Sequence, residues 1–141
     1  FVIEFLMPYE LVVVASPSHQ WVGRTALTLH DLQQETFLLR EQGSGTRLGT
    51  EQHFAHAGIS LQASLELGSI EAIKEGVAAG LGITVLSRES IALEVANGDL
   101  AVLNVQGFPL RRQWYIVYLK GGRLSRAASA LQQFLLQNEV G

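Results

Sequence analysis

The chain has 141 residues, of which 48% are hydrophobic, and its formal net charge at pH 7 is -3. This size predicts one compact domain or two small lobes with a real core, and the scattered Lys and Arg residues form no basic stripe of the kind that binds nucleic acid. The absence of cysteine excludes disulfides and thiol catalysis and favours a reducing compartment, so a cytoplasmic location is expected. No apolar run approaches the roughly 20 residues that span a bilayer, so no membrane partner is expected.

Hydrophobic periodicity and turn residues predict strands and helices in alternation along the chain. Extended segments are predicted at 1–6, 10–15, 36–39, 61–67, 82–86, 100–105 and 113–119. Helices are predicted at 29–34, from the turn at 43–46 to about Gly58, at 69–79, at 89–96, and in a final amphipathic stretch with Leu124, Ala128, Leu131 and Leu135. Pro8 should separate the first two extended segments, and the strand at 61–67 should place its alternate leucines on one apolar face. The alternation implies a largely parallel sheet with helices on its faces.

The segment 40–47, Arg-Glu-Gln-Gly-Ser-Gly-Thr-Arg, is the strongest candidate for a site, because it combines a strand end, a glycine turn and a helix start. The first amides of a helix lack partners and carry partial positive charge, so they can hold a carboxylate or a phosphate. Gly43 and Gly45 let the backbone turn tightly and approach a ligand, and Ser44 and Thr46 add hydroxyls. A capped helix after a tight turn, without any ligand, explains the same residues equally well.

A second strand-to-helix turn at Gly68 and Ser69 has the same character. Ser69 is a good N-cap for the helix at 69–79, in which Ile70, Ile73 and Val77 form one apolar stripe. In open α/β sheets ligands bind beyond the carboxyl ends of strands, so the two turns are expected to line one crevice.

Other kinds of site are less favoured by the residues. The glycine turn lacks the P-loop sequence and misses the dinucleotide spacing by one residue, which disfavours nucleotide cofactors. His53 and His56, three apart with Glu51 nearby, could begin a metal site, but no further ligand cluster accompanies them. Ser44 has neither a nucleophile-elbow sequence nor a definable His/Asp partner, so no enzyme, metal or cofactor is expected.

Two segments together, 37–47 and 66–88, resemble the effector-binding domain of LysR-type transcriptional regulators in both order and spacing. The segment 10–19 looks like the family's crossing strand, and 124–128 resembles the start of its last helix. The pattern Arg-Glu-x-Gly-Ser-Gly-Thr-Arg is most similar to regulators of carbon-fixation and related metabolic operons.

The resemblance implies an α/β, periplasmic-binding-protein-like fold of type II. One complete Rossmann-like lobe, 16–112, would be joined by two crossing strands to part of a second lobe, formed from 1–15 and 113–141. A small anionic metabolite, either an organic acid or a sugar phosphate, would bind between the lobes. The expected effector-binding residues are Ser16, Gly43, Ser44, Gly45, Thr46, Ser69 and Ile70.

The resemblance also bears on partners. The chain begins in mid-pattern at Phe1 without an initiator Met, so it looks like a fragment that lacks the family's helix-turn-helix, and DNA contact is expected only through that absent part. A homo-oligomer is expected, because truncation would expose strand edges and the apolar face of 124–136. The alternative is a free-standing solute-binding protein, or an enzyme, on the same two-lobe fold.

Overall fold

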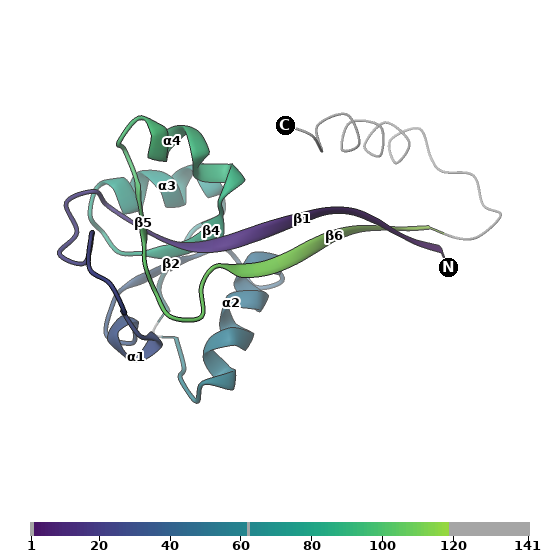
Figure 1. Ribbon diagram of the computed structural model, residues 1–141, viewed down its shortest axis with the longest axis horizontal. Helices are drawn as coiled ribbons and strands as arrows, with labels where there is room; N and C mark the ends of the chain where they lie inside the picture. The colour runs from purple at the N-terminus through teal and green to yellow at the C-terminus, as the bar shows by residue number, and fades with distance from the viewer. Residues whose placement is uncertain (1, 62, 119–141) are drawn as a thin grey trace. The chain divides into compact units, whose positions relative to one another are not determined.

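The computed structural model describes residues 2–61 and 63–118 (Figure 1). The chain divides into a larger compact unit, Glu10–Leu110, and a smaller unit that contains both chain ends, Phe1–Tyr9 and Arg111–Gly141. Of the smaller unit, residues 2–9 and 111–118 are described, and there β6 pairs with β1. The division into functional lobes at 15/16 and 112/113 stays a prediction.

Most of the predicted elements are present. The strands are β1 (Val2–Ala15), β2 (Phe37–Leu39), β3 (Ala63–Glu66), β4 (Thr84–Ser87), β5 (Ala101–Leu103) and β6 (Leu110–Tyr118). The helices are α1 (Leu29–Leu32), α2 (Gly45–His56), α3 (Ile70–Ala78), the 3₁₀ helix η1 (Glu89–Ile91) and α4 (Ala92–Ala96). The helix predicted at 124–136 lies outside the described residues. No helix within the described ranges has the length and apolar character that crossing a bilayer needs.

Two details of the strand prediction are wrong. Pro8 does not interrupt the first strand, since β1 runs without a break from Val2 to Ala15; the fixed φ of proline suits an extended backbone, and only one donor is lost. Leu65 is 42% exposed rather than on a buried face. The pairing of β2 with β3 shifts between Phe37 and Leu38, and such an irregularity adds a residue that turns the following side chains to the other face.

The prediction of a largely parallel sheet is also wrong. β1 lies between β4 and β5 and pairs antiparallel with both. Within the described residues, parallel pairing joins β2 with β3 and occurs at isolated bridges such as that of Phe37 with Ile83, which links β2 to the residue before β4. Two strands joined through a helix are parallel when they pair with each other. Here β1 does not pair with β2, the next strand along the chain; it pairs with β4 and β5, and both of these pairings are antiparallel.

The core of the larger unit forms around β1, β2, β4 and α3. In Figure 1, α3 and α4 lie on one side of β4 and α2 lies on the other. The predicted stripe of α3 is confirmed, because Ile73 and Val77 are buried in this core and Ile70 packs against it. The packing is close at Gly82, where an added Cβ would lie 2.4 Å from the carbonyl oxygen of Thr36.

Candidate functional site

The turns that follow β2 and β3 lie at one edge of the larger unit. The two strands are parallel, with Leu39 opposite Glu66, and the Leu67 N–H donates to the Leu39 carbonyl at 2.8 Å. Since neighbouring parallel strands have their carboxyl ends at the same edge of a sheet, the glycine turn and the Ser69 turn are neighbours. We call this side of the unit, with residues 40–46 and 67–71, the turn edge.

In the glycine turn, Ser44 is the residue that caps α2. Gly43 has φ +96°, a conformation that glycine adopts readily, and it directs the chain into Ser44. The Ser44 hydroxyl accepts a long hydrogen bond, 3.5 Å, from the Arg47 N–H. The carbonyl of Thr46 accepts a hydrogen bond from the Thr50 hydroxyl, 2.8 Å away. The hydroxyl of Thr46 makes no hydrogen bond within the described part of the chain.

Gly45 opens α2 beside free space. A Cβ built on Gly45 meets no atom within 4 Å, so packing within the chain does not require glycine there. The N–H groups of Gly45 and Thr46 make no hydrogen bond to any residue in 2–61 or 63–118, as expected for the first turn of a helix. The glycine therefore leaves these donors accessible from outside.

The Ser69 turn repeats this arrangement at the start of α3. The Ser69 hydroxyl accepts from the Ala72 N–H at 3.1 Å, while the N–H groups of Ile70 and Glu71 have no partner among the described residues. Both serines thus serve as helix caps, which is the alternative that the sequence left open. Capping occupies the two hydroxyls but leaves four backbone N–H donors at the turn edge.

Ser16 is separated from the other predicted site residues. It follows β1, which runs antiparallel to β4, with Val14 opposite Thr84. Because β2 and the start of β4 run in the same direction, Ser16 lies at the end of the sheet opposite the turn edge. It is buried, and its hydroxyl bonds to Ser18. A binding role for Ser16 stays a prediction that this placement does not support.

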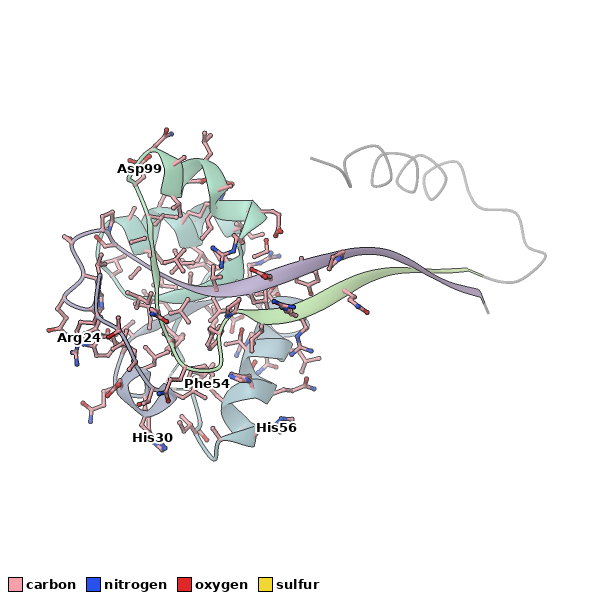
Figure 2. All side chains as sticks on the ribbon, viewed as in Figure 1. Arg24, His30, Phe54, His56 and Asp99 are labelled. Carbon is pink, nitrogen blue, oxygen red and sulfur yellow. The ribbon has the colours of Figure 1, made fainter. Side chains whose placement is uncertain are left out.

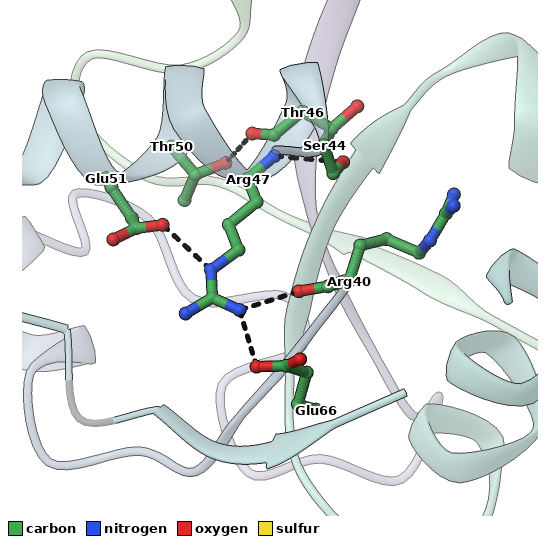
Figure 3. Close-up of polar contacts among 7 residues, drawn as sticks. All are labelled: Arg40, Ser44, Thr46, Arg47, Thr50, Glu51 and Glu66. Carbon is green, nitrogen blue, oxygen red and sulfur yellow. Dashed lines mark hydrogen bonds and ion pairs between the residues drawn. The ribbon is translucent and has the colours of Figure 1, made fainter. Parts of the chain in front are cut away.

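Behind the glycine turn, Arg47 connects three elements (Figure 3). Its side chain is only 10% exposed, and it donates to the carboxylates of Glu51 (2.8 Å) and Glu66 (2.9 Å) and to the Arg40 carbonyl (2.8 Å). The hydrogen bonds to Glu66 and Glu51 raise the pKa of Arg47. Arg47 was not predicted as a structural anchor, although its i,i+4 spacing from Glu51 was a usable signal.

The side chain of Arg40 lies on the other side of the turn from the Arg47 network, near Thr46 (Figure 3). It forms two hydrogen bonds with Glu41, at 3.0 and 2.8 Å, and the hydrogen bond from Arg40 lowers the pKa of Glu41. This pair is exposed to solvent, so it contributes little to stability and can exchange partners. Arg40 is therefore the cation at the turn edge that an incoming anion could bind.

The residues considered for a metal site are directed elsewhere. Glu51 binds Arg47, and the ring of His53 packs edge-on against Phe108, with centroids 5.2 Å apart. His56 is exposed at the end of α2 while Phe54 is buried (Figure 2). Among the described residues, no group of three or more His, Asp or Glu side chains is placed to hold a metal ion.

Comparison with known proteins finds matches over most of the chain. A family model for the LysR substrate binding domain matches residues 1–139. A RuBisCO operon transcriptional regulator of Allochromatium vinosum is 44% identical over 133 residues, which are 94% of this chain and 44% of that protein. The HTH-type transcriptional activator CmpR of Synechocystis sp. is 43% identical over 129 residues, 92% of this chain and 42% of that protein. The chain thus spans less than half the length of these curated relatives.

Solved structures show the same likeness. The regulatory domain of CcmR from Synechocystis PCC6803, in complex with 2-PG, superposes with a TM-score of 0.83 at 35% identity, covering 96% of this chain and 65% of that one. The effector binding domain of QuiR, in complex with shikimate, gives a TM-score of 0.75 at 25% identity, covering 98% and 66%. These neighbours have the periplasmic-binding-protein-like type II fold that the resemblance implied.

Proposed function

The chain belongs to the LysR substrate-binding domain family, and on that premise we propose that it senses a metabolite on behalf of a regulator of carbon-fixation genes. Its relatives are described as transcriptional regulators of the RuBisCO operon and as an activator of the HTH type. That description favours a regulatory domain over the alternatives of an enzyme or a free-standing solute-binding protein.

The proposed effector is a small anion with a phosphate or carboxylate group, held at the turn edge. The observation that carries this is a set of four N–H donors, two at the start of α2 and two at the start of α3, that have no partner among residues 2–61 and 63–118 and that the parallel pairing of β2 with β3 brings together. Helix N-termini favour anions through both these donors and the helix dipole. Arg40 adds an exchangeable cation, and the hydroxyl of Thr46 adds a further donor.

Within this class, 2-phosphoglycolate is the compound to test first. The CcmR regulatory domain was solved with 2-PG, and this molecule carries a phosphate and a carboxylate at opposite ends. Each end would suit one of the two helix starts. Other organic acids and sugar phosphates are the comparison compounds.

We further propose that effector binding here controls DNA binding by another part of a longer regulator, in the cytoplasm. The family model and the named relatives support this division of labour. Self-association of the chain stays a prediction.

The test is isothermal titration of 2-phosphoglycolate into the full-length gene product and its variants. Thr46→Ala removes one hydrogen bond to a charged group, so the affinity should fall about tenfold to a hundredfold, corresponding to about 1.5 to 3 kcal/mol. Thr28→Ala is the matched control, because Thr28 is a helix-capping threonine away from the turn edge. It should lower the unfolding free energy by about 1 kcal/mol and leave affinity unchanged.

Two further variants decide the location of the site. Gly45→Ala adds a methyl group at the first residue of α2, where a ligand would approach the backbone, and Arg40→Gln removes the cation. Each should weaken binding in a protein that remains folded. If Thr46→Ala, Gly45→Ala and Arg40→Gln all bind 2-phosphoglycolate as the parent does, the effector does not sit at the turn edge.

A further inference from the structure

A hollow of about 200 Å³ opens on the larger unit beyond the end of β5. None of the residues that line it belongs to the glycine turn or the Ser69 turn. Its walls are mostly apolar, from Val12, Val102, Phe108 and Pro109, and its polar groups are Arg88 and Asn104. The hollow thus combines an apolar body with one cation.

Arg88 is incompletely paired in the part of the chain that the structure describes. Its Nε donates to one carboxylate oxygen of Glu10 at 3.0 Å, and its two terminal nitrogens make no hydrogen bond with any described residue. Arg40, by contrast, makes two hydrogen bonds to its glutamate, and Arg47 reaches three acceptors. Guanidinium groups bind carboxylates best through two parallel N–H donors, so Arg88 retains the capacity for a second anionic partner.

The contact between Arg88 and Glu10 is also easy to rearrange. The side chain of Arg88 is 49% exposed and that of Glu10 is 34% exposed, and ion pairs open to solvent to this degree contribute little to stability. A ligand carboxylate that forks onto the terminal nitrogens can therefore bind without dismantling the fold. The backbone of Arg88 stays fixed meanwhile, because its N–H donates to the Glu10 carbonyl at 2.8 Å.

We propose that this hollow binds a small carboxylate with a branched or compact apolar group, the carboxylate on Arg88 and the apolar group between Val102 and Phe108. The volume corresponds to roughly six or seven liquid-water volumes, which is below the usual range for drug-sized ligands, so the occupant has few non-hydrogen atoms. The apolar walls favour a hydrocarbon part, which distinguishes this ligand from a wholly polar anion such as inorganic phosphate. The inference does not depend on the effector proposed for the turn edge.

The hollow and the turn edge nevertheless lie at the same end of the sheet. Arg88 follows β4, which runs in the same direction as β2, so Arg88 lies at the same end of the sheet as the glycine turn. A second ligand at this place would give a regulator two inputs, and any coupling between them must be reciprocal.

The test is an NMR titration of the 141-residue chain with 3-methylbutanoate, followed through backbone amide shifts. Saturable shifts are expected at Val102–Val105, next to the hollow, and not at Gly43–Thr46. Two matched probes separate the contributions: 3-methylbutanamide has the same shape without the charge, and acetate has the charge without the apolar group. Both should bind at least tenfold more weakly than 3-methylbutanoate, as should inorganic phosphate.

Three variants complete the experiment. Arg88→Gln should weaken binding at least tenfold, Arg88→Lys should give a smaller loss because it keeps the charge without the fork, and Asn104→Trp should abolish binding by filling the hollow from an exposed position. Arg24→Gln is the control and should bind as the parent does, because Arg24 is exposed and does not line the hollow. The proposal is overturned if the shifts map to Gly43–Thr46, if the amide probe binds equally well, or if folded Arg88 variants keep the parent affinity. If Arg88→Gln does not fold, the probe series and Asn104→Trp still decide.

Discussion

Replacing Gly82 by alanine should destabilise the protein far more than the same change at Gly45. An added Cβ at Gly82 would lie 2.4 Å from the Thr36 carbonyl oxygen and 2.9 Å from a methyl group of Leu38. The carbonyl oxygen cannot move freely, because it accepts from the Ile83 N–H at 2.9 Å and so helps join β2 to β4. Overpacking of this kind costs about 1 to 3 kcal/mol, and the strained hydrogen bond adds about 0.5 to 1.5 kcal/mol. The expected loss in unfolding free energy is therefore about 2 to 4 kcal/mol.

Gly45→Ala should have the opposite effect on the free energy of unfolding. The built Cβ at Gly45 meets nothing within 4 Å, and Gly45 is the first residue of α2, where alanine is preferred. The change should stabilise the protein by about 0.4 to 1 kcal/mol. Urea unfolding of both variants, followed by far-UV circular dichroism, gives the two free energies directly. A Gly82→Ala protein within about 0.5 kcal/mol of the parent, which is the usual range for an ordinary surface substitution, would refute the reasoning.

Three smaller predictions concern the elements that support the turn edge. Ser69→Ala should lower the unfolding free energy by about 1 kcal/mol, because the Ala72 N–H loses the hydroxyl that accepts its hydrogen bond. Ser69→Asp keeps a capping acceptor, so it should retain most of the parent's unfolding free energy in urea unfolding. Thr84→Val should cost about 1 to 3 kcal/mol in the same assay, since it leaves the Leu38 carbonyl without its buried 2.6 Å hydroxyl donor; an equal stability would show that this bond is dispensable. The hydrogen bond from Lys74 lowers the pKa of Glu94, so the stabilisation from this pair is complete above the unfolded-state pKa of Glu94 and is lost as the pH falls through the folded-state value. Lys74→Met should raise the pKa of Glu94, as measured by NMR titration. It should also remove the loss of stability that this pair causes as the pH falls.

The sequence predicted the local features of the candidate site well. Three features could each be predicted from about ten residues of sequence: the capping role of Ser69, the apolar stripe of Ile73 and Val77, and the position of the glycine turn. Helix caps and periodic apolar residues act over one or two turns, so their signals are contained in such windows. The turn edge followed from these features once the strand-to-helix order was known.

What the sequence could not provide was the long-range pairing. The place of β1 between β4 and β5 depends on contacts such as Val13 with Leu103, and no local pattern encodes them. The same holds for Arg47, whose partner Glu66 lies 19 positions away; burial of its charge depends on that distant carboxylate. Ser16 was assigned to the site from the resemblance alone, and only the antiparallel direction of β1 revealed that it lies at the other end of the sheet.

The central position of β1 also sets the order in which this unit can form during synthesis. Val13 pairs with Leu103, so the ribosome must add 90 further residues before this contact is possible, which takes roughly 5 to 20 seconds at typical elongation rates. The β-branched run Val12–Val14 is synthesised before β4 and β5 and has neither of them as a sheet neighbour until they emerge. During that interval an apolar strand with unpaired edges is open to aggregation. Nascent chains of this protein should therefore depend on chaperone protection until the whole of the larger unit has left the ribosome.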